Sequence, residues 1–299
     1  MAPLVRQRGT LVTQVLAVCV SADTLDKIPR RRPQLLMTTR TIHFILALML
    51  ALGLSSGQAA ATPSVFDDFD GPAGSPPNPN LWDYDVGSGW GNGKELQTYT
   101  NSTNNVYLDG QGHLVIAALK SDDNYTSGRL VTRGKLAMTY GTMSASIKLP
   151  AGQGIWPAFW MLGTNVFTVG WPQSGEIDAI EIYSIPTQYA ITVHGPSTQA
   201  PALGYQIQFN GGIADLSQGF HTYWVTREQG RITAGIDSAT LATFTPASMP
   251  PGGQWVFDNQ PMYGLLNVAV GGDLVGPPDA STPFPAAMVV DWFRYTPEG

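Results

Sequence analysis

The stretch Ser174-Gly-Glu-Ile-Asp-Ala-Ile-Glu-Ile-Tyr183 places three acidic residues in a segment that otherwise has the composition of a buried strand. Alternate residues of a strand face opposite sides of a sheet, so Glu176 and Asp178 share one face. Glu181 follows at an odd spacing, which would send its carboxylate into the core, where an unpaired charge is costly. One extra residue at Ala179–Ile180, a β-bulge, would return Glu181 to the face of the other two acids.

Short apolar or alternating runs bounded by Gly, Pro, Asn and Asp continue this pattern in both directions along the chain. No long helical stripe interrupts them after residue 61, and Asp70–Pro79 has the composition of a surface loop. The pattern predicts an all-β sandwich or jelly roll. The predicted strands are His113–Leu119, Met143–Leu149, Ile155–Leu162, Tyr189–His194, Thr222–Arg227, Arg231–Asp237, Tyr263–Val270 and Met288–Tyr295.

The first sixty residues differ in character from the rest. Met37–Arg40 is a positive start, Ile42–Leu54 is an apolar run and Ser55–Ala60 is a small-residue cleavage region, which together are typical of a secretory signal peptide. The apolar run is shorter than the roughly 20 residues of a membrane span, the competing interpretation. Residues 1–36 are consistent with a start codon assigned too early. The expected organisation is an N-terminal extension at 1–36, a signal peptide at 37–60 and one β-sandwich domain at 61–299.

Without its first sixty residues the chain is strongly acidic. The whole sequence has 16 basic and 22 acidic residues and the first sixty hold 7 and 2, which leaves 9 against 20 and a net charge of about −11. Such a surface repels nucleic acid and anionic membrane, and it gives no attraction to sulfated or uronic polymers. We therefore expect a neutral ligand. The domain contains no cysteine, so its core alone must stabilise it.

Two carboxyl groups on one strand face would lie roughly 5–7 Å apart, near the separation in retaining glycosidases. In that chemistry one carboxylate attacks the anomeric carbon, and the other, kept protonated partly by its neighbour's charge, donates a proton to the leaving oxygen. Asp178 between them would share a proton, so the three would titrate as a coupled group. A calcium site and a solvated acidic strand are alternatives that the residues leave open.

Gly175-Glu-Ile-Asp-Ala-Ile-Glu181 resembles the Glu-x-Asp-x-x-Glu signature of glycoside hydrolase family 16, in the bulged form of laminarinase-type endo-β-1,3-glucanases. The resemblance extends over nearly all of residues 65–295 and implies a concanavalin-like β-jelly-roll sandwich of two antiparallel sheets, with a substrate cleft across the concave sheet. The other matching blocks, in the family's order, are Trp90–Thr100, Ser127–Thr132, Tyr140–Met143, Ile147–Pro150, Gly154–Trp160, Phe220–Tyr223 and Leu266–Gly272.

The resemblance also implies roles for the three acids. Glu176 matches the family's nucleophile, Glu181 matches its acid/base and Asp178 matches its assisting aspartate. His194 resembles the family histidine near the catalytic centre, although a histidine satisfied at a strand end would have the same appearance. No cofactor is required for this chemistry.

Sugar recognition needs flat apolar surfaces beside planar polar groups. Trp156 and Trp160 are four residues apart, share a strand face and resemble cleft tryptophans of the family; packing in the core is the alternative for both. Glu95 is a candidate for substrate binding or for bracing a loop. The other expected substrate-binding residues are Trp90, Asn92, Gln97, Arg129 and Asn267.

The chain departs from the family pattern in places that bear on substrate preference. Ser144–Lys148 replaces a segment that usually reads Glu-Ala-Arg-Ile-Lys, Arg227 stands where a tryptophan is usual, and Leu274–Gly276 replaces Trp-Pro-Gly. Members of the family often hold one structural calcium ion away from the cleft. The resemblance assigns it to Asp291, Asp68 and the carbonyl group of Gly110, and calcium prefers such oxygen ligands.

The sequence thus predicts a secreted, monomeric, retaining endo-glycosidase that cuts internal β-1,3 bonds, and also mixed β-1,3-1,4 bonds, of a neutral β-glucan. It predicts no nucleic-acid partner and no membrane association after signal cleavage. One alternative is a non-catalytic β-glucan-binding protein on the same fold, a class that typically lacks the acids. The other is a related hydrolase or transglycosylase acting on another polysaccharide, such as a galactan or xyloglucan.

Overall fold

The protein is represented by a computed structural model. It describes residues 63–90, 94–212, 215–258 and 260–298. The expected N-terminal extension and signal peptide lie outside the described residues. Within the described ranges, no helix is long and apolar enough to span a membrane.

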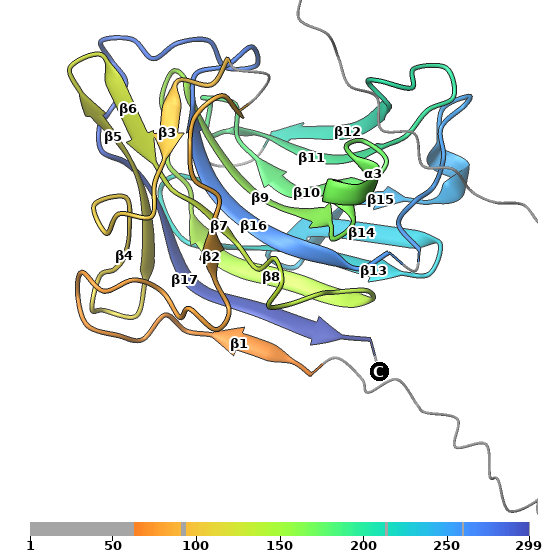
Figure 1. The fold of residues 1–299 in the computed structure, drawn as a ribbon, viewed down its shortest axis with the longest axis horizontal. Helices are drawn as coiled ribbons and strands as arrows, with labels where there is room; N and C mark the ends of the chain where they lie inside the picture. Colours follow the sequence, from red (N-terminus) through yellow and green to blue (C-terminus); the bar gives the residue numbers. More distant parts are fainter. Residues whose placement is uncertain (1–62, 91–93, 213–214, 259, 299) are drawn as a thin grey trace, which may run out of the picture. The chain divides into compact units, whose positions relative to one another are not determined.

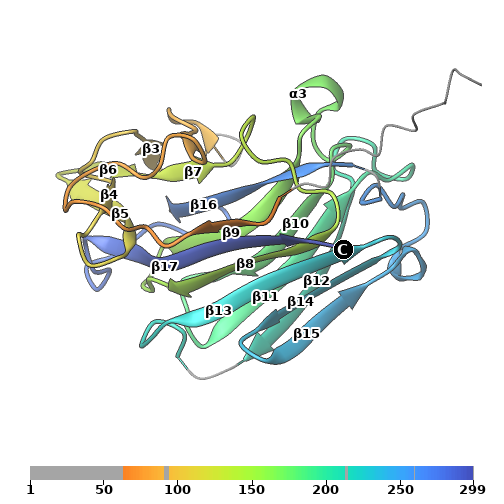
Figure 2. The same ribbon diagram turned by 90° about the horizontal axis from the view of Figure 1, so that it is seen from below.

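The chain forms two β-sheets that face each other across one core (Figures 1 and 2). In the ten-stranded sheet the order is β15-β14-β13-β8-β17-β5-β6-β3, with β1 added to β17 and β4 to β5. Its strands are β1 Val65–Asp67, β3 Gln97–Tyr99, β4 Val106–Leu108, β5 Leu114–Ser121, β6 Asn124–Ser127, β8 Gly141–Lys148, β13 His221–Glu228, β14 Arg231–Ile236, β15 Ala239–Phe244 and β17 Ala286–Pro297.

The seven-stranded sheet has the order β12-β11-β10-β9-β16-β7-β2 and is antiparallel throughout. Short helices lie outside the sheets: α3 at Val166–Val169, between β9 and β10, and the 3₁₀ helix η1 at Pro246–Ser248. The strands of this sheet are β2 Asp83–Tyr84, β7 Arg129–Val131, β9 Ile155–Gly163, β10 Glu176–Glu181, β11 Gln188–Gly195, β12 Tyr205–Gly212 and β16 Met262–Val270.

This architecture confirms the predicted β-sandwich. Every predicted strand is present with its ends moved by at most a few residues, as β11 at Gln188–Gly195 shows for the expected Tyr189–His194. The edge strands β12 and β15 were not predicted, because their outward side chains are exposed and dilute the apolar signal. One detail differs from the expectation of purely antiparallel sheets, since β3 and β6 pair in parallel.

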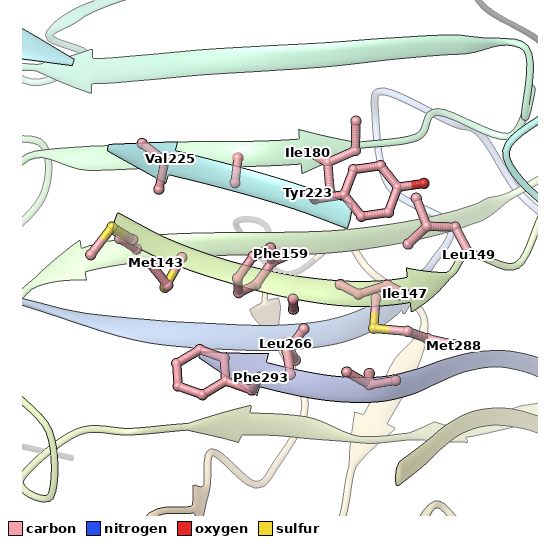
Figure 3. Close-up of a cluster of buried hydrophobic side chains, with 14 of the residues drawn as sticks. Met143, Ile147, Leu149, Phe159, Ile180, Tyr223, Val225, Leu266, Met288 and Phe293 are labelled. Carbon is pink, nitrogen blue, oxygen red and sulfur yellow. The ribbon is translucent and has the colours of Figure 1, made fainter. Parts of the chain in front are cut away.

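The core lies between the two sheets and takes side chains from both (Figure 3). Phe159 of β9 and Leu266 of β16 extend from one sheet, and Ile147 of β8 and Phe293 of β17 extend from the other. The rings of Phe159 and Phe293 meet edge to face with centroids 6.4 Å apart. Because this face of each strand is committed to the core, polar residues at the alternating positions of the seven-stranded sheet face outward.

Two of the departures from the family pattern lie in the other sheet. Ser144 is buried on β8, and Arg227 is 2% exposed on β13. The Arg227 guanidinium donates hydrogen bonds of 2.6–2.8 Å to the backbone carbonyls of Met138, Phe257 and Gln260. Arg227 therefore changes the interior and its loop connections, whereas Ser144 alternates with the core residues Met143 and Ala145 and lies on the outer face of its sheet. Neither residue lines the cleft, although an effect on substrate contacts is expected from the sequence.

Candidate active site

Strand β10 carries the three acids, and its register confirms the predicted bulge. Against β9, Asp178 pairs with Trp160 and Ile180 pairs with Phe159, so Ala179 is the extra residue. Against β11, the register also shifts between Asp178 and Glu181. Ala179 and Ile180 are fully buried in the core, and the shift allows Glu181 to line the same cleft as Glu176 and Asp178.

Gly175 makes the turn into this strand possible. Its φ of +71° lies in the left-handed region, which side-chain-bearing residues rarely adopt. A Cβ atom at this position would also approach Val256 Cγ2 to 3.0 Å and Phe257 Cε1 to 3.1 Å. The glycine before Glu176 thus fixes the direction in which the first acid leaves the loop.

A cleft of about 590 Å³ lies over the acid-bearing face of the seven-stranded sheet. Side chains from β7, β9, β10 and β16 form its floor, and loops form its rim. The size is in the range of small-molecule and oligosaccharide sites, which run from about 300 to 1,000 Å³. The lining residues are Trp90, Glu95, Arg129, Trp156, Ala158, Trp160, Leu162, Trp171, Glu176, Asp178, Glu181, Asn267, Ala269 and Leu274.

Aromatic and cationic groups form one end of the cleft. The Arg129 guanidinium lies 4.3 Å from the ring centroid of Trp90 and 4.7 Å from that of Trp160. Its Nε donates to Asp85, which holds the guanidinium in place. Trp160 Nε1 donates to the side-chain oxygen of Asn267 at 2.8 Å. Trp156 and Trp160, the predicted cleft tryptophans, both line the cleft, and Trp160 also packs against the small buried cluster of Val131, Leu162, Tyr263 and Leu265.

Glu181 is held by two hydrogen bonds. Trp156 Nε1 donates to Glu181 Oε1 at 2.9 Å, and the Tyr183 hydroxyl donates to Glu181 Oε2 at 2.8 Å. The Trp156 and Tyr183 rings meet edge to face, with centroids 5.7 Å apart. These contacts fix both oxygens of a carboxyl group that is only 7% exposed.

His194 lies on the neighbouring strand, directly opposite Glu176. Its Nε2 is 3.6 Å from Glu176 Oε1 and 3.3 Å from Asp178 Oδ2. One side-chain nitrogen or oxygen atom of each of the three residues lies within 4.8 Å of the others, so His194 and the two acids form one polar cluster. The structure thus brings His194 to the acids, which it contacts without lining the cleft itself.

Burial governs the protonation of the acids. It raises the pKa of Glu176 to about 8, with a further increase from Asp178 and a decrease from His194. Burial also raises the pKa of Asp178 well above its usual range, and the charge of Glu181 adds to this rise. The pKa of Glu181 is raised by burial and partly lowered by the hydrogen bond from Tyr183. The three acids therefore retain protons near neutral pH as a coupled group; the general-acid role requires one of these protons on Glu181, and attack by Glu176 requires Glu176 to be the ionised member.

Because folding raises the pKa of Glu176, we expect Glu176→Gln to stabilise the folded protein by an amount that depends on pH. Since the pKa of Glu176 rises from 4.5 to about 8 on folding, its contribution to stability is complete below pH 4.5 and is lost as the pH rises through 8. Glutamine does not ionise, so the variant does not lose stability in this way. Its melting temperature should match that of wild type at pH 4.5 and exceed it by roughly 5 °C at pH 8. Solvent reaches 17% of the Glu176 side chain, which limits the rise in melting temperature.

Calorimetric melts across this pH range test the prediction, with Glu298→Gln as a control at an exposed carboxylate. A difference in melting temperature between Glu176→Gln and wild type that stays the same across the pH range would contradict the prediction.

Of the predicted substrate-binding residues, one needs correction and one falls outside the described residues. Gln97 is fully buried: its Oε1 accepts from the backbone N–H of Val270 at 2.7 Å, and its Nε2 donates to Glu95 at 2.6 Å. Direct contact with substrate is therefore not available to Gln97, which instead orients Glu95 at the cleft rim. Asn92 lies outside the described residues.

Other cleft residues were not predicted. Trp171 follows α3 in the loop between β9 and β10, with its ring centroid 5.9 Å from that of His194. Leu274, noted only as a departure from the family, also lines the cleft. Loop residues such as these have no periodicity that could place them. Tyr183 could have been found, because it is two residues after Glu181 and alternation predicts a shared face.

The residues predicted to hold calcium lie on neighbouring segments. Strand β1 pairs with β17 so that Asp67 is opposite Phe293, which brings the following Asp68 toward the part of β17 that contains Asp291. A Cβ atom at Gly110 would lie 3.0 Å from the backbone nitrogen of Ala73, so the turn at Gly110 packs on the loop that follows Asp68. The oxygen donors suit calcium, and calcium binding stays a prediction.

Comparisons with known proteins agree with this geometry. The family model described as glycosyl hydrolases family 16 matches residues 93–294. The chain is 37% identical over 244 residues to a "Beta-glucanase" of Rhodothermus marinus, covering 76% of this chain and 82% of the relative. It is 34% identical to "Glucan endo-1,3-beta-glucosidase A1" of Niallia circulans, of whose length it spans 36%.

Solved structures show the same likeness. The laminarinase catalytic domain of Thermotoga maritima superposes with a TM-score of 0.68 at 33% identity, covering 80% of this chain and 99% of that one. The endo-β-1,3-glucanase of Pyrococcus furiosus gives 0.67 at 38% identity, covering 78% and 94%. The acids, the jelly-roll sheets, the family model and these relatives together show that the chain is a glycoside hydrolase that belongs to glycoside hydrolase family 16.

Proposed function

We propose that the protein is a secreted endo-glycosidase that hydrolyses internal β-1,3 bonds of laminarin-like β-glucan, and also mixed β-1,3-1,4 bonds, with retention of configuration. The observation that carries the proposal is the bulge in β10, which allows the buried acids Asp178 and Glu181 and the half-buried Glu176 to line one tryptophan-rich cleft. A binding protein without activity would have no need for this arrangement, because removing three neighbouring carboxyl groups from water is destabilising.

The substrate class is supported by the relatives and by the chemistry of the cleft. The relatives named above are a β-glucanase, an endo-1,3-β-glucosidase and a laminarinase. Trp156 and Trp160 offer flat apolar surfaces for sugar rings, and Asn267 and Glu95 offer planar polar groups for hydroxyls. The strongly acidic domain favours a neutral polymer over an anionic one.

The mechanism follows from the positions of the acids. The Glu176 carboxylate attacks C1 of the sugar while the Glu181 carboxyl group gives its proton to the glycosidic oxygen, so the C1–O bond breaks and a glycosyl ester forms. Water then attacks C1 and loses a proton to Glu181, which frees Glu176. Asp178 and His194 lie beside Glu176 and adjust its charge through both steps. Two inversions at C1 restore the original configuration.

Three further properties belong to this proposal. We infer secretion from the signal peptide that the sequence predicts at 37–60, which N-terminal sequencing of the exported protein would test. The expected monomer can be tested by sedimentation. A structural calcium ion held by Asp68, Asp291 and the carbonyl group of Gly110 would stabilise the fold away from the cleft, and loss of thermal stability on chelation would test it.

Product analysis on laminarin, lichenan, agarose and xyloglucan tests the proposed function. We expect oligosaccharides of mixed length from laminarin early in the reaction, slower release from lichenan, and β-configured reducing ends by NMR before mutarotation. Cleavage of agarose or xyloglucan in preference to laminarin would overturn the substrate assignment. Initial products of α configuration would overturn the retaining mechanism.

A further inference from the structure

The floor of the tryptophan-lined cleft lies on one side of the catalytic acids, and among the described residues of its rim only Trp171 reaches His194 on the other side. Its floor comes from β10, β9, β16 and β7, which follow one another in the sheet order. An enzyme that cuts inside a polymer must also hold sugar units on the other side of the scissile bond. That side is formed by β11 and by β12, the edge strand of the sheet (Figure 1).

Three amide side chains on β12 lie in line with the acids. Across β11, Glu176 pairs with His194 and then Gln206, and Asp178 pairs with Thr192 and then Gln208. Glu181 pairs in the same way with Ala190 and then Asn210. Paired residues of adjacent strands point to the same face of a sheet. We call Gln206, Gln208 and Asn210 the amide row.

The intervening residue on β12 confirms this orientation. Ile207 packs against the core between the sheets, so its neighbours point to the opposite, cleft-bearing face. Gln206 and Asn210 are exposed and Gln208 is half-buried. Two strand spacings separate the backbone of the amide row from that of the acids, a distance of about 9.6 Å across the sheet, which is long enough for sugar units to lie over β11.

The amides are ordered with respect to one another. Gln206 Nε2 donates to Gln208 Oε1, and Gln208 Nε2 donates to Asn210 Oδ1. Each amide nitrogen carries a second hydrogen, and each oxygen has a second lone pair. The row therefore presents oriented donors and acceptors to solvent, without charge, which matches the hydroxyl groups of a neutral sugar.

A second hollow lies at the end of the amide row, where β11 begins and β12 ends. It has a volume of about 400 Å³ and includes Asn210 and Tyr183, whose hydroxyl donates to Glu181. The surface beyond the acids is thus hollowed and polar at the point where a polymer would leave the catalytic centre. The other lining residues are Gln188, Tyr189, Gly211 and Gly212.

We infer that the amide row binds the sugar units on the far side of the scissile bond from the tryptophan-lined cleft. The inference rests on the proposed function, because it assigns a subsite of the same glucan-cleaving centre. It makes the row a determinant of how long a chain the enzyme prefers, with no part in bond cleavage.

Binding measurements on inactive protein test this inference. Oligosaccharides from laminaribiose to the octasaccharide are titrated calorimetrically into Glu176→Gln and into the same protein with Gln206→Ala, Gln208→Ala and Asn210→Ala. Long oligosaccharides should bind about 10- to 100-fold more weakly without the row, which corresponds to roughly 1.4–2.8 kcal/mol. Short oligosaccharides, held by the tryptophans, should bind to both proteins with the same affinity. Asn104→Ala with Gln111→Ala, two exposed amides next to β4 of the other sheet, is the matched control.

The outcomes separate the inference from the proposed function. Equal affinity with and without the row at every length would overturn the inference, and so would an equal loss at every length, because that would indicate damage to the acids. If Glu176→Gln with the row intact binds none of these oligosaccharides, the proposed β-glucan substrate is wrong and the inference falls with it. Melting temperatures within a degree or so of the parent protein show that the row variants are folded.

Discussion

Glu176→Gln should lower kcat/KM on laminarin by about 10⁴-fold or more, because the amide cannot form the glycosyl ester. The fold and the affinity for glucan should remain, since the side chain of Glu176 makes no hydrogen bond to any described residue and the amide has nearly the same shape. The dissociation constant of a long oligosaccharide is expected to stay within a few-fold of wild type. Glu298→Gln, at an exposed position, should retain full activity.

Chemical rescue distinguishes a nucleophile from other essential residues. In Glu176→Ala, azide can enter the vacated space and attack C1 directly, so an aryl β-glucoside substrate should yield the α-configured glycosyl azide. A single displacement inverts the configuration, which NMR of the product reads out. A β-configured azide from this variant, or rescue at Glu181 with inversion, would reverse the two assignments. Wild-type activity of the glutamine variant would remove Glu176 from the mechanism.

The position of these acids was predictable because an unpaired carboxyl group is too costly to place in the core. A strand with Ile177 in the core cannot place Glu181 there too, so the odd spacing required an extra residue, and the register shift at Ala179 supplies it. The central strands were predictable for the same reason, since their inward residues are uniformly apolar. Edge strands such as β12 have exposed faces and a weaker pattern, which is why the amide row was missed.

The sequence could not show how deeply each side chain is buried or in which direction a loop side chain points. Gln97 matches a family position near the cleft, but a match gives a place along the chain and not the accessibility of a side chain, which here is fully buried. Trp171 reaches the cleft from a loop after α3, where no periodicity indicates a direction. The site therefore combines strand residues that alternation predicts with loop residues that only the folded chain brings together.

The activity of Glu181→Gln should depend strongly on whether the leaving group needs a proton, and this dependence should identify Glu181 as the acid. Glu181→Gln cannot protonate the glycosidic oxygen, so its kcat/KM on laminarin should fall by about 10²–10⁴-fold. A dinitrophenyl glycoside needs no protonation to depart, so its first step should be almost unaffected. Without a general base to activate water, the glycosyl ester on Glu176 should then accumulate, and a burst of dinitrophenolate equal to the enzyme concentration should precede slow turnover.

Azide completes this test because it needs no general base. In Glu181→Ala it should attack the glycosyl ester on Glu176, accelerate the slow phase and give a β-configured glycosyl azide, since two displacements have then occurred at C1. Tyr183→Phe is the matched control: it removes one hydrogen bond to the Glu181 carboxyl group but keeps the carboxyl itself, so it should show no burst. Equal losses on laminarin and on the dinitrophenyl glycoside would mean that Glu181 does not act as the acid, and the roles proposed for the three carboxyl groups would have to be reassigned.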